Sequence, residues 1–228
     1  NLGIKERRIA LPNQTTSDLA AEAGRKAIEK AGLKPDDIDL IIVATATPDR
    51  LAPSTAAIVQ DKLKAYNSVA FDVAAVCSGF LFSISTASQF IATGVYNNAL
   101  VIGADTFSKI IDWSRRDCVF FGDGAGAAVL SHTETDGGFL AFRLYTDGRG
   151  KWNFTIPGGG SEFPLSYENV DAGYRYFQMN GKAVYETGVK VLPKAIWQVL
   201  KDTRLSINDI DYMIPHQPSI KILKDTAE

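Results

Sequence analysis

Short apolar runs alternate with segments of helical periodicity over the first half of the chain. The run Leu40–Ala44 is apolar at every position, which is typical of a strand buried on both faces of a sheet. Comparable runs predict two further strands, and helical spacing predicts the helices beside them. The predicted strands are Leu40–Ala44, Val69–Val73 and Ala99–Gly103, and the predicted helices are Asp18–Gly32, with Ser17 as N-cap, Ala52–Leu63 and Gly79–Gly94. This alternation predicts an α/β fold with a largely parallel sheet.

The glycine-rich segment Phe120–Leu130 predicts a turn followed by another strand. It lacks the lysine-containing pattern of a phosphate-binding loop, and no predicted helix follows it. We interpret its small residues as allowing close backbone approach near a candidate active cysteine.

A turn and strand pattern occurs twice in the chain. Leu33–Asp39 matches Leu205–Asp211 at a constant offset, and a helical segment precedes each copy. An apolar segment follows each copy, which predicts a second-half strand at Tyr212–Ile214. The pattern favours an internal duplication over a chance recurrence of a common helix–turn–strand unit.

The duplication suggests three regions. They are a first half, residues 1–130, an excursion of loops and hairpins, residues 131–178, and the start of a second half, residues 179–228. The first half continues far beyond its turn, whereas the second ends soon after His216. We therefore interpret the second half as incomplete and the chain as a piece of a longer protein. The excursion has two open interpretations, a functional lid or a region without chemistry.

Composition excludes several classes of protein. The net charge of −2 gives no basic field for nucleic acid, and no apolar run reaches the length of a membrane span. Two cysteines make no disulfide framework, so a reducing cytoplasm is the expected location. Two histidines argue against a histidine-rich metal site, and we expect no metal.

Cys77 is the candidate nucleophile. It lies between the predicted strand Val69–Val73 and the predicted helix Gly79–Gly94. The free N–H groups and dipole of a helix N-terminus lower the pKa of a thiol, so we expect a reactive thiolate. A cysteine among small residues is more often structural, and local sequence alone leaves both interpretations open.

His216 is the candidate partner of Cys77. It follows the predicted strand Tyr212–Ile214 and stands between two prolines, at the kind of strand end where α/β sheets place ligand-contacting residues. An imidazole there could donate to a carbonyl oxygen or transfer protons, and the two residues could meet where the halves join.

Arg116 and Trp113 are candidates for binding a nucleotide. A guanidinium suits a phosphate and an indole ring suits a nucleobase. A solvated surface turn explains the same residues equally well, and both interpretations remain open.

Four motifs in order closely resemble the β-ketoacyl-acyl-carrier-protein synthase III family of the thiolase superfamily. They are Phe71–Phe80 (FDVAAVCSGF), Phe121–Leu130 (FGDGAGAAVL), Met179–Val184 (MNGKAV) and Pro215–Gln217 (PHQ). The resemblance covers almost the whole chain. It implies a duplicated, layered α-β-α-β-α thiolase-like fold and a cytoplasmic homodimer that starts fatty acid synthesis. It implies no cofactor, with an acyl-CoA thioester as primer substrate and malonyl-acyl-carrier protein as its extender.

The resemblance also implies roles for individual residues. Cys77 matches the acylated nucleophile and His216 the first member of a catalytic His/Asn pair. Arg116, with Trp113 nearby, matches a CoA contact, and Ser219 stands where pantetheine contacts are expected. Lys221 and Lys224 match a basic region that meets carrier protein. The family's His-Gly-Asn segment and its C-terminal glycine-rich loop are not found in these residues.

Two other functions remain open at this stage. One is a related thiolase-fold condensing enzyme or acyltransferase of a secondary pathway. The other is a catalytically inactive scaffold.

Overall fold

The computed structural model describes residues 3–135 and 137–227, and the chain separates into two compact units. The Cys77 unit comprises Arg7–Lys109 and Phe121–Phe139. The His216 unit comprises Asn1–Glu6, Ile110–Phe120 and Leu140–Glu228. Each unit is described by itself.

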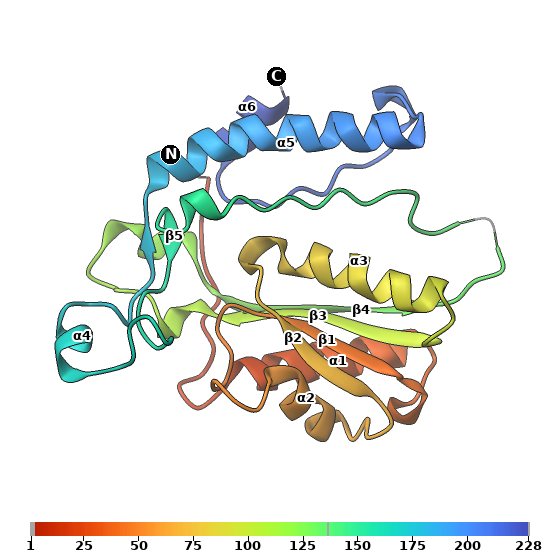
Figure 1. Ribbon diagram of the computed structural model, residues 1–228, viewed down its shortest axis with the longest axis horizontal. Helices are drawn as coiled ribbons and strands as arrows, with labels where there is room; N and C mark the ends of the chain where they lie inside the picture. Colours follow the sequence, from red (N-terminus) through yellow and green to blue (C-terminus); the bar gives the residue numbers. More distant parts are fainter. Residues whose placement is uncertain (1–2, 136, 228) are drawn as a thin grey trace. The chain divides into compact units, whose positions relative to one another are not determined.

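The Cys77 unit is a sheet of four strands between helices. Its strands are β1 (Leu40–Ala44), β2 (Val69–Val73), β3 (Asn98–Thr106) and β4 (Asp123–Ser131), and its α-helices are α1 (Thr16–Lys30), α2 (Thr55–Leu63) and α3 (Gly79–Ala92). The strand order is β2-β1-β3-β4. β1 pairs in parallel with β2 and β3, and β4 is antiparallel to β3. Figure 1 shows α3 on one face of the sheet and α1 and α2 on the other.

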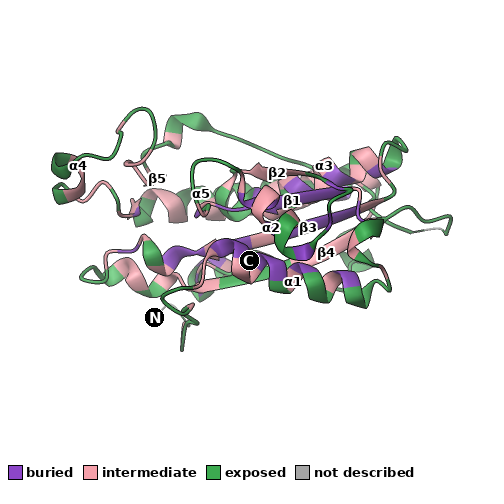
Figure 2. Cartoon of the chain, turned by 90° about the horizontal axis from the view of Figure 1, so that it is seen from below, coloured by how far each residue is buried: buried purple, intermediate pink, exposed green. Residues whose placement is uncertain are grey.

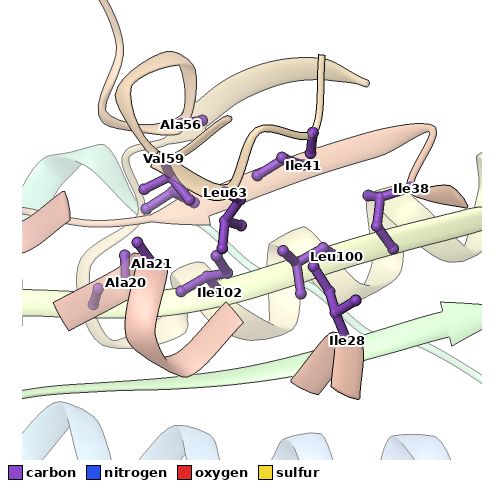
Figure 3. Close-up of a cluster of buried hydrophobic side chains, with 13 residues drawn as sticks. Ala20, Ala21, Ile28, Ile38, Ile41, Ala56, Val59, Leu63, Leu100 and Ile102 are labelled. Carbon is purple, nitrogen blue, oxygen red and sulfur yellow. The ribbon is translucent and has the colours of Figure 1, made fainter. Parts of the chain in front are cut away.

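Two apolar clusters hold the helices against the sheet. β1 is buried at every residue, as its apolar run predicts (Figure 2). Ile41, which is labelled in Figure 3, and Val43 join the cluster under α1 and α2, and Leu40 and Ile42 join the cluster under α3. Each fully buried aliphatic side chain contributes about 1.5–3 kcal/mol to folding. The packed sheet therefore fixes the positions of the residues at the ends of its strands.

Helix capping corrects the predicted start of α1. Thr15, not Ser17, is the N-cap, and Thr15 and Asp18 form a reciprocal capping box. Ser17 is instead a buried residue within the helix, where its hydroxyl donates to Asp49 Oδ2 at 2.6 Å. α2 begins at Thr55, later than predicted. There the Asp72 carboxylate accepts hydrogen bonds from the first backbone N–H groups of the helix.

The His216 unit has α-helices and one short two-stranded ladder. The helices are α4 (Tyr167–Asp171), α5 (Gly181–Thr203) and α6 (Ile220–Ala227), and β5 (Phe154–Thr155) pairs antiparallel with β6 (Gln178–Met179). α5 is the helical segment that the sequence predicts before the second copy of the turn. Arg143 forms an ion pair with Asp202, which ties the segment before β5 to the end of α5.

The predicted strand at Tyr212–Ile214 is wrong. These residues have no strand structure, and Tyr212 and Ile214 are 88% and 93% exposed. A strand requires a neighbour to accept and donate its ladder hydrogen bonds. No strand among the described residues pairs with this segment, so its apolar sequence alone does not make it a strand.

The repeated turn has the same local geometry in both copies. Asp37 Oδ2 accepts from the Lys34 N–H at 2.7 Å, and Asp209 Oδ2 accepts from the Ser206 N–H at 2.8 Å. Each turn contains a short 3₁₀ helix, Pro35–Asp37 in the first copy and Ile207–Asp209 in the second. The hydrogen bonds agree with the internal duplication predicted from sequence.

Candidate active site

Cys77 lies on a strained turn between β2 and α3. After β2 the chain forms a 3₁₀ turn, Val76–Ser78, and α3 begins at Gly79. Val76 has a φ of 47°, a left-handed conformation that a β-branched side chain rarely adopts. Such strain costs on the order of 1–3 kcal/mol and concentrates at functional sites. A sharp strand-to-helix turn that exposes a nucleophile is a recurrent catalytic arrangement, and Cys77 is exposed here.

Two glycines let the start of α3 lie close to the sheet. A β-carbon at position 79 would lie 2.9 Å from the Ala44 β-carbon at the end of β1. A β-carbon at Gly103 on β3 would lie 3.4 Å from the Phe80 ring. The turn that carries Cys77 is therefore held at the carboxyl ends of the parallel strands, where α/β proteins bind ligands.

Asp105, near the end of β3, organises the loop that follows β1. Its Oδ1 accepts four hydrogen bonds, from Thr45 Oγ1, the Ala46 N–H and both the N–H and Oγ1 of Thr47, at 2.8–3.1 Å. Burial raises the pKa of Asp105 above its ordinary value, and these hydrogen bonds oppose that rise.

The pKa of Cys77 is shifted in the direction opposite to the sequence prediction. Although the residue is exposed, desolvation by the surrounding protein raises the pKa of its thiol, and the negative charge of Asp105 raises it further. A backbone hydrogen bond lowers the pKa but has the smaller effect. The free thiol is therefore the favoured form, and the predicted resting thiolate is wrong.

Sequence reasoning missed Asp105 and the strain at Val76. Asp105 follows the predicted strand Ala99–Gly103 closely, and an acidic residue at the end of a buried strand is a signal that could have identified it. Backbone conformation at Val76 has no comparable sequence signal, because valine normally disfavours positive φ.

The glycine-rich segment lies close to a different part of the chain from the one predicted. A β-carbon at Gly122 would lie 2.8 Å from the Arg8 carbonyl oxygen, whereas positions 124 and 126 have no heavy atom that close. Asp123 then receives hydrogen bonds from Ala10 and Ser108. The close backbone approach is therefore to the N-terminal segment of this unit, and not to the cysteine.

His216 is an exposed residue in the segment before α6. Desolvation by the protein around the ring lowers its pKa, so the neutral imidazole is favoured at pH 7. Neutral imidazole carries one N–H donor and one acceptor nitrogen. Since Cys77 and His216 belong to different units, the predicted meeting of the two residues stays a prediction.

The other residues of the His216 segment have partners of their own. Ser219 is buried, and its Oγ accepts from the Ile222 N–H at the start of α6. Lys221 is paired with Asp225 and donates to the Tyr185 hydroxyl, and these two contacts raise the pKa of the lysine. Lys224 is exposed and forms no ion pair within residues 3–135 and 137–227. Of the two lysines, Lys224 is the more available cation.

Trp113 and Arg116 are exposed and close in sequence. The neighbouring Arg115 is paired with Asp117 through two of its nitrogens. Arg116 has no ion pair within the described part of the chain. Between the two arginines, the one predicted to contact a phosphate is therefore the one whose charge is unpaired.

Two other kinds of feature are missing from the described residues. In this part of the chain no three histidine, cysteine, aspartate or glutamate side chains gather as a metal site would require. Nor does any described helix combine the length and apolar character needed to cross a membrane.

A family model and the curated relatives of this chain agree on one family. The model of the 3-oxoacyl-[acyl-carrier-protein] synthase III family matches residues 71–148, which include Cys77 and Asp105. The chain is 51% identical over 223 residues to β-ketoacyl-[acyl-carrier-protein] synthase III of Caldanaerobacter subterraneus, covering 97% of this chain and 67% of that protein.

Solved structures show the same likeness. The structure of 3-oxoacyl-[acyl-carrier-protein] synthase III from Aquifex aeolicus has a TM-score of 0.88 and 36% identity, with 99% of this chain and 68% of that chain covered. The priming β-ketosynthase of the R1128 polyketide biosynthetic pathway has a TM-score of 0.86 and 29% identity, with 99% and 67% covered.

Proposed function

The chain belongs to the β-ketoacyl-[acyl-carrier-protein] synthase III family, with a thiolase-like α/β fold of which it spans about two thirds, and we propose that it forms an acyl-enzyme on Cys77. The proposed reaction is the decarboxylative condensation of an acyl-CoA primer with malonyl-acyl-carrier protein, which starts fatty acid synthesis. The observation that carries the proposal is the exposure of Cys77 on the strained turn between β2 and α3.

The first half of the proposed reaction is acyl transfer. The Cys77 sulfur attacks the thioester carbonyl, the bond from that carbon to the CoA sulfur breaks, and the CoA thiolate leaves. The CoA thiolate takes up the proton that the Cys77 thiol loses, so free CoA is released as a thiol. This proton exchange suits a cysteine that rests as a thiol. Backbone N–H groups at the start of α3 can stabilise the oxyanion.

The second half is condensation. The malonyl carboxylate leaves as CO₂, and its electron pair forms the enolate of the carrier-bound thioester. The enolate carbon attacks the acyl carbonyl on Cys77, and the cysteine sulfur leaves. We assign neutral His216 as the hydrogen-bond donor to the enolate oxygen, a role supported by its lowered pKa.

The proposal includes the binding of two large substrates. Arg116 and Trp113 hold the nucleotide of CoA, and Ser219 lies beside its pantetheine arm. Lys224 meets the acidic carrier protein, with Lys221 beside it. The free charge of Arg116 and the exposure of Lys224 support these roles. For Ser219 the same hydroxyl also caps α6, so its substrate contact is the least supported of these assignments.

A cytoplasmic homodimer also belongs to the proposal. Both cysteines are free, which suits a reducing compartment. β2 is one of the two edge strands of its four-stranded sheet, and its first residue, Val69, is 50% exposed. An edge strand offers backbone groups with which a second subunit can pair.

Mass spectrometry after incubation with acyl-CoA tests the proposal. We expect the mass of one acyl group on the peptide that contains Cys77. The adduct should be lost in Cys77→Ala and kept in Cys118→Ala, which removes the other cysteine of the chain. Absence of an adduct on the parent protein would contradict the proposal and favour an inactive scaffold.

A second candidate function is a condensing enzyme of a secondary pathway. The likeness to the R1128 priming ketosynthase favours it, although the identity to that protein is lower. Both functions require the acyl-Cys77 adduct. A β-ketoacyl product that depends on malonyl-acyl-carrier protein supports the first function, and a product formed only with another acceptor supports the second.

A further inference from the structure

Three buried threonine hydroxyls meet at the carboxyl ends of β1 and β3, beside the start of α1. Thr47 lies in the loop that follows β1, Thr106 is the last residue of β3, and Thr16 is the first residue of α1. None of the three is more than 7% exposed. A hydroxyl buried to this extent needs hydrogen-bond partners within the protein.

The hydroxyl protons of these three threonines have one consistent arrangement. Thr16 Oγ1 donates to the Thr47 carbonyl oxygen at 2.6 Å, so it accepts from Thr106 Oγ1 at 2.8 Å. Thr47 Oγ1 accepts from the Thr106 N–H at 2.8 Å and donates to Asp105 Oδ1 at 2.9 Å. Each hydroxyl carries a single proton, and each of these protons has an acceptor. A buried network whose members are all satisfied makes the local structure rigid.

Thr47 connects the loop after β1 to two other elements. Its carbonyl oxygen binds α1, and its hydroxyl binds the end of β3. Its N–H donates to Thr45 Oγ1 at 3.0 Å and to Asp105 Oδ1 at 3.1 Å. Thr45 Oγ1 also donates to Asp105, at 3.1 Å. Thr47 and Asp105 together therefore fix the position of Thr45.

The residues Ala44 and Thr45 contact both ends of the turn that carries Cys77. At the end of β2, before the turn, the Val73 carbonyl accepts from the Thr45 N–H at 3.3 Å. After the turn, Gly79 packs against Ala44, and a β-carbon at position 79 would lie 3.7 Å from the Val73 carbonyl oxygen. A displacement of the loop after β1 would therefore move the chain on both sides of the cysteine.

We propose that Thr47 is a positioning residue for Cys77, which acts by holding Ala44 and Thr45 against both ends of the turn. Its catalytic meaning rests on the proposed acyl transfer, which needs the sulfur and the N–H groups at the start of α3 in one geometry. Small displacements of reacting groups reduce rate constants steeply. Loss of a positioning residue therefore lowers the rate constant of acylation without changing the affinity for acyl-CoA.

Thr47→Val is the test variant, because valine has nearly the shape of threonine and no hydroxyl. It removes the acceptor of the Thr106 N–H and one donor to Asp105. Thr47→Ser keeps the hydroxyl and should behave as the parent does. The matched control is Ser68→Ala, which removes another buried hydroxyl, located before β2 and therefore at the strand end away from the turn. Urea unfolding measures the stability that each variant loses.

Hydrogen exchange over residues 74–79 tests the positioning directly and needs no substrate. The Ser78 N–H donates to the Ala75 carbonyl at 3.1 Å within the turn. We expect its exchange to become about tenfold faster in Thr47→Val, because a buried N–H without its acceptor weakens the loop that holds the turn. Thr47→Ser and Ser68→Ala should exchange as the parent does. Parent-like exchange in folded Thr47→Val would overturn the proposal.

The second measurement is the rate of acyl-enzyme formation, followed by intact mass over a range of acyl-CoA concentrations. In Thr47→Val the maximal rate constant should fall by about tenfold or more, while the concentration that gives half of this maximum keeps the parent's value. Thr47→Ser should restore the rate constant. A parent-like rate constant in Thr47→Val, or an equal loss in Ser68→Ala at equal loss of stability, would overturn the proposal.

If Thr47→Val does not fold, Thr16→Val decides in the same two assays, because it removes the hydrogen bond from α1 to the Thr47 carbonyl oxygen. Parent-like exchange and acylation in that variant would overturn the proposal. The two assays also separate this inference from the proposed function. Faster exchange in Thr47→Val with no acyl adduct on the parent protein would refute only the proposed function. An adduct on the parent, with parent-like exchange and rate in Thr47→Val, would refute only the role of Thr47.

Discussion

Gly79 packs against Ala44 so closely that a β-carbon on the glycine would lie 2.9 Å from that of the alanine. This contact joins the first residue of α3 to the last residue of β1. Real β-carbons do not approach so closely, and both contacting groups belong to rigid elements, so neither can turn aside.

Gly79→Ala should therefore push α3 away from the sheet. We expect a loss of about 1–3 kcal/mol in the free energy of unfolding, the usual cost of overpacking. Gly126→Ala is the control, because no heavy atom lies within 4 Å of its β-carbon position. Urea unfolding of both variants makes the comparison. Equal stability would show that the sheet adapts to the added methyl group.

Arg204→Gly should stabilise the protein by roughly 1 kcal/mol, because only glycine adopts a left-handed conformation without steric cost. Arg204 is the C-cap of α5 and has a φ of 58°. Its counterpart in the first copy of the repeat is Gly32, with a φ of 70°. Thermal unfolding measures the gain.

Arg204→Ala separates the backbone effect from loss of the side chain. This variant keeps a β-carbon and should gain nothing. If it stabilises the protein as much as glycine does, the arginine side chain and not its backbone conformation is the source of the cost.

Asp18→Asn should reduce stability near neutral pH, and its difference from the parent should shrink as pH falls toward 2. The hydrogen bond to Lys62 lowers the pKa of Asp18 to about 2 from its ordinary value of 3.8, and the backbone of Thr15 adds to the effect. A carboxyl with a lowered folded-state pKa stabilises the fold above its ordinary pKa. That contribution is lost as pH falls through the folded-state value.

The size of this effect is modest because the Asp18 side chain is 40% exposed. We expect less than about 1 kcal/mol. Urea midpoints at several pH values between neutral and 2 give the measurement, and Lys62→Met should reproduce the loss. A difference from the parent that persists unchanged at pH 2 would assign the effect to the capping box and not to the charge.

His216→Ala should separate the two halves of the proposed reaction. We expect acylation of Cys77 to continue and condensation to fall by about a hundredfold or more, the usual effect of losing a donor to a developing oxyanion. Acylation is followed by intact mass and condensation by CO₂ release. His132→Ala, another exposed histidine, should change neither. Equal loss of both steps would make the assigned role of His216 wrong.

Sequence predicted the elements that depend on local burial and missed those that depend on a distant partner. β1 and β2 have the predicted limits because their apolar residues lie in a sheet covered by helices. β3 runs beyond Gly103 to Thr106, since Asp105 and Thr106 pair with residues of β4. Tyr212–Ile214 has similar apolar character but no described strand beside it, and it forms none.

The candidate site follows the same rule. The position of Cys77 between a strand and a helix was predictable from neighbouring residues and is confirmed. Its pKa was not, because desolvation and the charge of Asp105 both depend on how the chain folds around the thiol. The position at a helix N-terminus predicts one contribution to the pKa of the thiol. The folded environment decides the direction of the net shift.

The division of the chain into units has a consequence for synthesis on the ribosome. The Cys77 unit uses no residue beyond Phe139, whereas α5 and His216 come later. Domains generally fold as they emerge during translation, the N-terminal parts first. The nascent chain can therefore form its sheet and the strained turn at Val76 before His216 has been synthesised. During that interval the turn with Cys77 is folded while the segment with His216 is still absent.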